Sequence, residues 1–239
     1  MKIALYTAII NPAAPFGITE NMDKLTLSTE KYGVDCFCFT NNPELKSDVC
    51  KVVLVDLWNN DPVRTARRIK VLPHEYLPDE YDYSIWVDGK VRLNQNPTKL
   101  VEKLSKQDKA FFARKHDKRD CIYQEAELLI GLASTSNYKD DPLVIEKQMS
   151  LYRQQGVPKH LGLIASYVLI RKHGDDSLKQ CEEKWWEMIS CHSRRDQLAF
   201  PYAVWLTGFD YDNIVDSDFH QYFRVGQHRI KNGKIRNVV

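Results

Sequence analysis

The stretch Tyr83-Ser84-Ile85-Trp86-Val87-Asp88-Gly89-Lys90 joins a short apolar run to an acid, a glycine and a lysine. It is one of several β-like runs that alternate along the chain with helical patterns. That order is typical of a largely parallel sheet with helices on its faces. Ligands of such open sheets bind beyond the carboxyl ends of the strands. The stretch therefore predicts a strand that ends at a ligand-binding edge, with Asp88 at that edge.

The rest of the chain supports a single α/β domain. The other β-like runs cover residues 2–10, 34–39, 51–57, 110–114 and 166–171. Right-handed crossovers between parallel strands make such a chain a doubly wound, Rossmann-like unit. Asp61-Pro62 and Asp141-Pro142 each combine an N-cap residue with a first-turn proline, which predicts helices over 63–76 and from 142 onward. A further helix is expected from about Asp176. At 239 residues we expect one domain, 1–239.

Composition excludes several classes of protein. The chain has 34 basic and 32 acidic residues, a formal net charge of +2, whereas a dedicated nucleic-acid binder carries a strong basic excess. The apolar residues 3–10 are too few for a membrane span, and Asn11-Pro12 ends them without a signal-type cleavage site. We expect no transmembrane segment and a cytoplasmic protein, either free or held at the inner face of the membrane.

The six cysteines show no zinc-binding spacing. Cys36 and Cys38 alternate within a β-like run, so we expect both on one face of a strand. Because no CxxC pair is present, buried reduced thiols are expected rather than a metal site.

Polar residues at the ends of the runs are the candidate site. Asp88 can ligate a divalent metal or accept hydrogen bonds from ribose hydroxyls. Gly89 permits close approach of a ligand to the backbone, and Lys90 can offset phosphate charge. The alternative for Asp88-Gly89 is a plain turn between two paired strands.

Two further segments carry candidate residues. Arg64, Arg67 and Lys70 are spaced by three, so on a helix they share a broad face suited to a diphosphate; a solvated basic face is the alternative. His116, Arg119 and Glu125 lie between a β-like run and a helix. They are expected either to bind ligand hydroxyls and move protons, or to be surface charge.

Asp196 is the candidate general base or sugar-binding carboxylate. Ser193 and Asp196 have the spacing of a capping box, so Asp196 is expected at a helix N-terminus, where a carboxylate stays ionised. The basic segment 224–236 contains His228 and is expected either to close over phosphates, with His228 as a metal ligand, or to be a disordered terminus.

Taken together, these segments resemble a glycosyltransferase-like family found in plant mucilage and cell-wall proteins and in bacterial polysaccharide clusters. The matching segments are Tyr6-Thr7-Ala8-Ile9, Cys38-Phe39-Thr40-Asn41, Asp61 through Lys70, Ile85 through Lys90, His116 through Glu125, and Arg195-Asp196-Gln197-Leu198-Ala199-Phe200. They span nearly the whole chain in one order, which is more specific than any single motif.

The resemblance implies a GT-A fold with a nucleotide-binding half, 1–115, and an acceptor and catalytic half, 116–239. It also implies transfer of a sugar from a nucleotide-diphosphate sugar, with UDP favoured, to a glycan or lipid-linked glycan. The expected setting is bacterial surface polysaccharide synthesis (capsule, O-antigen or LPS). The alternatives are a nucleotidyltransferase that makes a nucleotide sugar and a non-catalytic carbohydrate-binding domain.

The resemblance also assigns roles to residues. The donor would be bound by Thr7, Ala8, Thr40, Arg64, Arg67, Lys70, Asp88, Gly89 and Lys90. Donor sugar or acceptor would contact His116, Arg119, Glu125 and Gln197. Asp196 would be the base of an inverting reaction, or would stabilise an oxocarbenium-like sugar in a retaining one. Mn²⁺ or Mg²⁺ would bind Asp88 and His228; since only one acid stands where GT-A enzymes carry Asp-x-Asp, Lys90 is an alternative to the metal.

Overall fold

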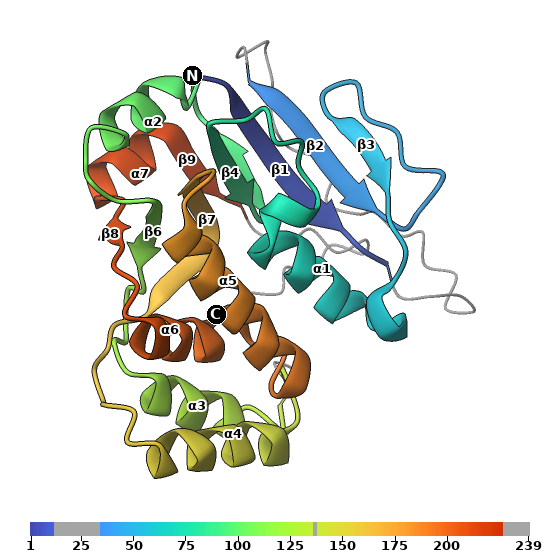
Figure 1. Ribbon diagram of the computed structural model, residues 1–239. Coiled ribbons are helices and arrows are strands. Elements are labelled where there is room, and N and C mark those ends of the chain that lie inside the picture. The colour runs from blue at the N-terminus through green and yellow to red at the C-terminus, as the bar shows by residue number, and fades with distance from the viewer. Residues whose placement is uncertain (12–33, 136–137, 227–239) are drawn as a thin grey trace.

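The computed structural model describes residues 1–11, 34–135 and 138–226. Its centre is a seven-stranded sheet of order β3-β2-β1-β4-β7-β6-β8 (Figure 1). The strands are β1 (Ile3–Ile9), β2 (Asp35–Thr40), β3 (Lys51–Leu54), β4 (Tyr83–Val87), β6 (Phe111–Lys115), β7 (Ile164–Lys172) and β8 (Asp212–Asn213). All neighbours are parallel except β7, which is antiparallel to both β4 and β6. The predicted α/β class with a mostly parallel sheet is confirmed.

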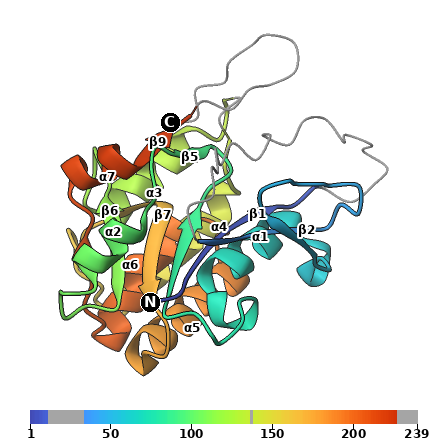
Figure 2. The ribbon, with the colours of Figure 1, turned by 90° about the horizontal axis from the view of Figure 1, so that it is seen from above.

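Seven helices flank this sheet in the described residues. They are α1 (Pro62–Val71), α2 (Thr98–Leu104), α3 (Ile122–Gly131), α4 (Pro142–Gln154), α5 (Asp176–Cys191), α6 (Asp196–Thr207) and α7 (Asp216–Tyr222). A second, two-stranded sheet pairs β5 (Val91–Leu93) with β9 (Phe223–Val225). Figure 2 shows α1 beside β1 and β2, with α2 and α7 on the other side of the molecule.

Both predicted Asp-Pro helix starts are confirmed. The Asp61 carboxylate accepts a hydrogen bond from the Arg64 amide, and that of Asp141 accepts one from the Leu143 amide. The first helix is shorter than predicted, because α1 ends at Val71 and a 3₁₀ turn, Pro73–Glu75, follows. A proline inside the helix has no N–H for the ladder and clashes with the preceding turn, which accounts for the break.

The two faces of the sheet bury alternate residues of each strand. Tyr6 and Trp86 pack on the side of α1, α5 and α6, whereas Leu5 and Ile85 pack on the side of α2 and α7. The period of two residues along a strand produces this division. The sheet is thereby covered on both faces, and its carboxyl edge is left as the place for a ligand.

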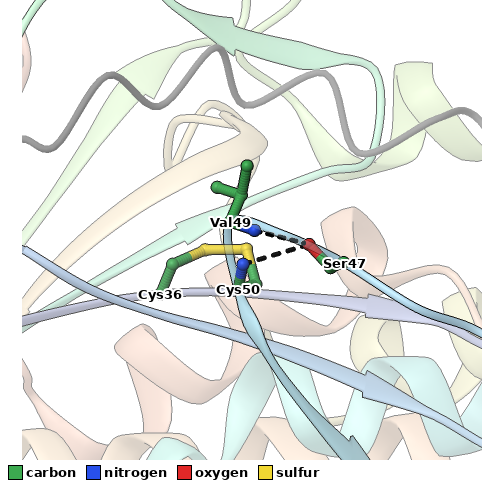
Figure 3. Close-up of a disulfide and its surroundings, with 4 residues drawn as sticks. All are labelled: Cys36, Ser47, Val49 and Cys50. Atoms are coloured by element: carbon green, nitrogen blue, oxygen red, sulfur yellow. Dashed lines mark hydrogen bonds between the residues drawn. A yellow bond between two sulfur atoms is a disulfide. The ribbon is translucent and has the colours of Figure 1, made fainter.

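The cysteine prediction is wrong for two residues. Cys36 and Cys50 form a disulfide with an S–S distance of 2.08 Å (Figure 3). The register that pairs Phe37 with Lys51 brings the two preceding cysteines together, and no sequence spacing reveals that register. Cys38 lies on the same face as Cys36, as predicted, and is a buried thiol.

The other described cysteines carry free thiols: Cys121 and Cys181 are buried, and Cys191 is exposed rather than buried as predicted. No helix within the described part of the chain has the length and apolar character to cross a bilayer.

Candidate functional site

A cavity of about 750 Å³ opens at the carboxyl edge of the sheet. It lies where β4 and β6 end, where the antiparallel β7 begins, and where α1 and the start of α6 approach. It is lined by Arg67, Lys70, Asp88, Lys90, Arg114, His116, Asp117, Lys118, Arg119, Glu125, Ala165, Ser166, Tyr167, Arg195, Asp196, Gln197, Phe219, His220, Arg224 and Val225. Residues more than 150 positions apart in the chain therefore meet at the edge that the sequence predicted.

Asp88 follows β4 directly and faces this cavity. Its amide donates to the Tyr167 carbonyl at 2.9 Å, and its Oδ1 accepts from the Trp86 indole Nε1 at 2.9 Å. The side chain remains 28% exposed. Because β5 pairs with β9 and not with β4, Asp88-Gly89 is not the turn of a β4–β5 hairpin. A Cβ at Gly89 would meet no atom within 4 Å, so packing does not require glycine there.

A buried ion pair lies behind Asp88. The Lys70 Nζ donates to Asp196 Oδ2 at 2.6 Å and to Ser166 Oγ at 3.0 Å, and it lies 3.5 Å from Asp88 Oδ1. The Ser166 hydroxyl also donates to Asp196 Oδ2, at 2.8 Å. The side chains of Lys70 and Asp196 are 1% and 2% exposed. Helix α1, strand β7 and helix α6 are thus joined by one polar cluster.

Cations keep Asp196 charged. Burial raises the pKa of a carboxyl, but Arg67, Lys70 and Arg195 outweigh it and hold the pKa of Asp196 well below its usual range. Burial lowers the pKa of Lys70, and Asp196 and Asp88 oppose that effect. Both Asp196 oxygens already accept protein hydrogen bonds, since the Gln197 amide donates to Oδ1 at 3.2 Å. A carboxylate in this state is a weak base and a fixed negative charge.

Two arginines beside this cluster have unused donors. Arg67 on α1 places Nη1 3.7 Å from Asp196 Oδ2, which is close enough for attraction but too long for a hydrogen bond. Arg195 precedes α6 and donates through Nη2 to the Gln197 side chain at 3.1 Å. The Nε atom of each is buried and has no hydrogen-bond partner among the described residues. Both residues line the cavity, so their guanidinium groups can take an anionic ligand from it.

The segment between β6 and α3 forms another wall. His116 Nδ1 accepts the amide hydrogens of Arg119 at 3.1 Å and Lys118 at 3.3 Å. Burial lowers the pKa of His116, so the neutral ring carries its proton on Nε2 and can donate it in a hydrogen bond. Arg119 Nε donates to the buried Glu125 at 2.6 Å. Gln197 Nε2 donates to the Ile164 carbonyl at 3.0 Å.

Other predicted donor-binding residues do not line the cavity. Arg64 donates to the carbonyls of Ile189 at 3.0 Å and His192 at 2.7 Å, so it joins α1 to the end of α5. Arg64, Arg67 and Lys70 therefore do not share one face as predicted. Because a helix has about 3.6 residues per turn, residues spaced by three point in successively different directions around its axis.

Thr7, Ala8 and Thr40 lie towards the carboxyl ends of β1 and β2, outside the cavity lining. The Thr40 hydroxyl accepts from the Asn42 amide at 3.1 Å. The Thr7 hydroxyl is buried without a hydrogen-bond partner in the described part of the chain.

The capping box predicted at Ser193 and Asp196 is wrong. Helix α6 begins at Asp196 with Arg195 as its N-cap, and the Ser193 hydroxyl donates instead to Asp140 at 2.7 Å. The Ser193 oxygen accepts the amide of Arg195 at 3.2 Å, which precedes the helix, and not the amide of Asp196. The expected place of Asp196 at a helix N-terminus is confirmed.

Asp88 is the one predicted metal ligand that lies within the described residues. Asp88 Oδ1 already faces the Lys70 ammonium, and no group of three or more His, Cys, Asp or Glu side chains suited to a metal occurs between residues 34 and 226 as far as they are described. His228, the second predicted ligand, lies outside the described residues. The prediction of Mn²⁺ or Mg²⁺ through Asp88 and His228 stays a prediction.

Several lining residues were not predicted, above all Ser166, Tyr167, Arg114 and Arg195. Candidate site residues were expected only after the carboxyl ends of strands, which holds when all strands are parallel. Because β7 is antiparallel to β4 and β6, its start, not its end, lies at the cavity. The signal available in the sequence was the polar Ser166 within an apolar run. Arg114 lies within β6 and is fixed by Tyr167 and Asp216.

Comparison with known proteins gives this cavity a family context. Residues 38–221 match the family model described as TOD1/MUCI70, glycosyltransferase-like domain. A protein of Arabidopsis thaliana described as "Probable hexosyltransferase MUCI70" is 29% identical over 166 residues, which are 65% of this chain and 27% of that protein. The chain therefore corresponds to a minor part of the length of that relative.

Two solved structures are similar at low sequence identity. The apo WbbM bifunctional glycosyltransferase has a TM-score of 0.49 and 6% identity, covering 90% of this chain and 38% of that one. Mouse xyloside xylosyltransferase 1, also in apo form, has a TM-score of 0.45 and 10% identity, covering 90% and 84%. The family model includes Lys70, Asp88, Ser166 and Asp196 within its matched range, and the chain belongs to the TOD1/MUCI70 glycosyltransferase-like domain family.

Proposed function

We propose that the protein transfers a hexose from a nucleotide-diphosphate sugar, most simply a UDP-sugar, to a hydroxyl group of a glycan. The observation that carries the proposal is the meeting of Asp88, Lys70 and Asp196 in a large polar cavity at the carboxyl edge of the sheet. The family and the hexosyltransferase relative support the reaction class. The acceptor is proposed to be a glycan or lipid-linked glycan of a surface polysaccharide such as capsule, O-antigen or LPS, on the resemblance seen in the sequence.

The cavity suits a diphosphate leaving group. Lysine and arginine side chains outnumber the acids in its lining, and Arg67 and Arg195 have unused donors there. Charge develops on the diphosphate as the bond to the sugar breaks, so fixed cations stabilise the transition state more than the ground state. The donor is therefore proposed to place its phosphates near α1 and the start of α6.

Hydrogen-bonding side chains would position the sugar. Asp88 has an exposed carboxylate that can accept hydrogen bonds from sugar or ribose hydroxyls, and His116 has a free Nε2–H to donate. Orientation of this kind lowers the entropy cost of reaching the transition state. Asp196 is proposed to act electrostatically, by holding Lys70 and the two arginines, rather than as the base first predicted.

The test is a melting-temperature screen of the full chain against UDP-, GDP-, CMP- and dTDP-sugars, followed by assay of nucleotide release with glycan acceptors. A ligand present at 100 times its Kd stabilises the folded state by roughly 2.7 kcal/mol, so the correct donor should raise the Tm by several degrees. Asp88→Asn should remove turnover. The matched control is Asp108→Asn, an exposed aspartate before β6 and hence at the opposite edge of the sheet.

Two results would count against the proposal. If no nucleotide sugar shifts the Tm or releases nucleotide with any acceptor, the transferase function is lost. If the chain instead forms a nucleotide sugar from a nucleoside triphosphate and a sugar 1-phosphate, it is a nucleotidyltransferase.

A further inference from the structure

The cavity carries positive charge that its own acids do not neutralise. Arg119 is paired with Glu125 and Arg114 with Asp117 and Asp216, so these cations are matched within the wall. Lys70, Arg67 and Arg195 instead meet around the carboxylate of Asp196, and Lys70 also lies 3.5 Å from Asp88 Oδ1. Three cations thus face two carboxylates around the start of α6, and Lys90, Lys118 and Arg224 add positive charge elsewhere in the lining.

Buried contacts fix the positions of the side chains around Asp196. Asp196 Oδ2 is 2.6 Å from the Lys70 ammonium and 3.7 Å from the Arg67 guanidinium, and the Asp196 side chain is buried behind both. The buried Nε atoms of Arg67 and Arg195 find no acceptor among the described side chains and backbone. Because leaving a buried charged donor unsatisfied is costly, a ligand with several anionic oxygens is the natural complement. The N-terminus of α6 adds a helix dipole of the same sign.

The same place disfavours a divalent cation. Of the two carboxylates beside Lys70, Asp88 is the more exposed, and its Oδ1 lies 3.5 Å from Lys70 Nζ and accepts from Trp86. A metal ion bound to this oxygen would lie close to an ammonium group and be repelled by it. The described donor set therefore fits an anion and not a metal.

We infer that Arg67 and Arg195, with Lys70 between them and Asp196 behind, bind the donor pyrophosphate directly and make donor binding independent of a divalent metal. This inference rests on the proposed function, since the pyrophosphate is that of the nucleotide sugar. Arginine suits the role because its planar fork can make paired hydrogen bonds to phosphate oxygens.

The test uses inorganic pyrophosphate, which has the shared chemistry and needs no knowledge of the nucleotide or sugar. Its binding to the full chain is measured by calorimetry in EDTA. We expect binding to persist in EDTA, to weaken about tenfold or more in Arg67→Gln and in Arg195→Gln, and to recover in part in the two Lys variants. The matched controls are Arg68→Gln, whose residue pairs with Glu75, and Arg194→Gln, whose residue pairs with Asp140; neither lines the cavity.

Circular dichroism and Tm of each variant separate loss of binding from loss of folding, and the Lys variants keep the test valid if a Gln variant unfolds. The inference is overturned if EDTA abolishes binding of both pyrophosphate and the donor, and Mn²⁺ restores donor binding. It is also overturned if the Arg67 and Arg195 variants bind pyrophosphate as tightly as the control variants do. Metal-dependent transfer would then leave the proposed function standing. Conversely, pyrophosphate binding in EDTA with no response to any nucleotide sugar would support this site and remove the proposed function.

Discussion

The carboxylate of Asp196 lies 2.6 Å from the ammonium group of Lys70, and neither side chain is more than 2% exposed. The two residues are 126 positions apart, at the start of α6 and near the end of α1. This contact holds the polar cluster together and so connects stability to the chemistry of the cavity.

Replacing one member of this pair should lower the free energy of unfolding more than replacing both. Lys70→Met leaves a buried carboxylate and Asp196→Leu a buried ammonium, so each should lower the free energy of unfolding by about 3–5 kcal/mol. The double variant leaves neither member of the pair alone, although Arg67 and Arg195 lose Asp196 as well, and it should recover part of that loss while lacking transferase activity. Urea denaturation of the set measures the coupling; a double variant as unstable as the sum of the singles would show that the pair contributes little.

Asp88→Asn should separate activity from stability. The side chain is 28% exposed, so the variant should melt within a few degrees of the natural protein. Loss of the charge that orients the donor should lower kcat by roughly 100-fold, as for other groups that act in the transition state. Steady-state kinetics supply kcat and KM separately. Natural kcat in the folded variant would exclude Asp88 from the reaction.

Arg64 and Arg67 should behave in opposite ways although both were predicted to bind the donor. Arg64→Met leaves the carbonyls of Ile189 and His192 without their donor and should lower the free energy of unfolding by about 1–3 kcal/mol. Its donor affinity should change less than about threefold. Arg67→Met should show the reverse pattern. Denaturant titration with donor binding distinguishes them, and equal loss of affinity in both variants would return Arg64 to the donor site.

Reduction should destabilise the β2–β3 end of the sheet. The disulfide closes a loop with a sequence separation of 14 residues. Closing a loop of that size lowers the conformational entropy of the unfolded chain, which adds about 3 kcal/mol to the free energy of unfolding. Dithiothreitol should therefore lower the Tm of the natural protein, and the Cys36→Ser/Cys50→Ser variant should melt at the lower temperature with or without reductant. A Tm unaffected by reductant, with labelling of both thiols, would contradict this.

His173 should make stability fall in mildly acidic solution. Burial, with Arg171 and His74 nearby, lowers the pKa of His173 to about 4 against an ordinary 6.5, while Asp79 and Asp82 act in the other direction. The folded state therefore prefers the neutral ring. The stabilisation is complete above about pH 6.5 and is lost progressively as the pH falls towards 4, because the unfolded chain takes up the proton first.

His173→Gln should reduce the slope of unfolding free energy between pH 6.5 and 4. Denaturant titrations at several pH values measure that slope in both proteins. An unchanged slope would assign the acid sensitivity to other groups.

The elements of the fold were largely predictable because they depend on local signals. Asp61-Pro62 and Asp141-Pro142 combine a cap with a fixed φ, and both open helices where predicted. The apolar runs before Asn11, Thr40 and Asp88 became β1, β2 and β4, and the resemblance seen in scattered segments agrees with the matched family. These features require only neighbours within a few residues.

What failed depended on contacts between distant segments. The disulfide follows from the β2–β3 register. The Ser193 hydroxyl donates a hydrogen bond to Asp140, and Arg64 donates to the His192 carbonyl at the end of α5. Helical spacing predicted that Arg64, Arg67 and Lys70 share a face, but it does not say which partner each side chain meets.

The sequence by itself determined the α/β class, the edge after the Trp86 strand at which the cavity opens, and the family. It does so because strand periodicity, helix caps and motif order are properties of the chain. Only the tertiary structure decided that β7 runs against its neighbours and so brings Ser166 to Lys70 and Asp196. Strand direction and the burial of an ion pair are set by packing across the sheet, where the hydrophobic and electrostatic energies of residues far apart in the chain are added together.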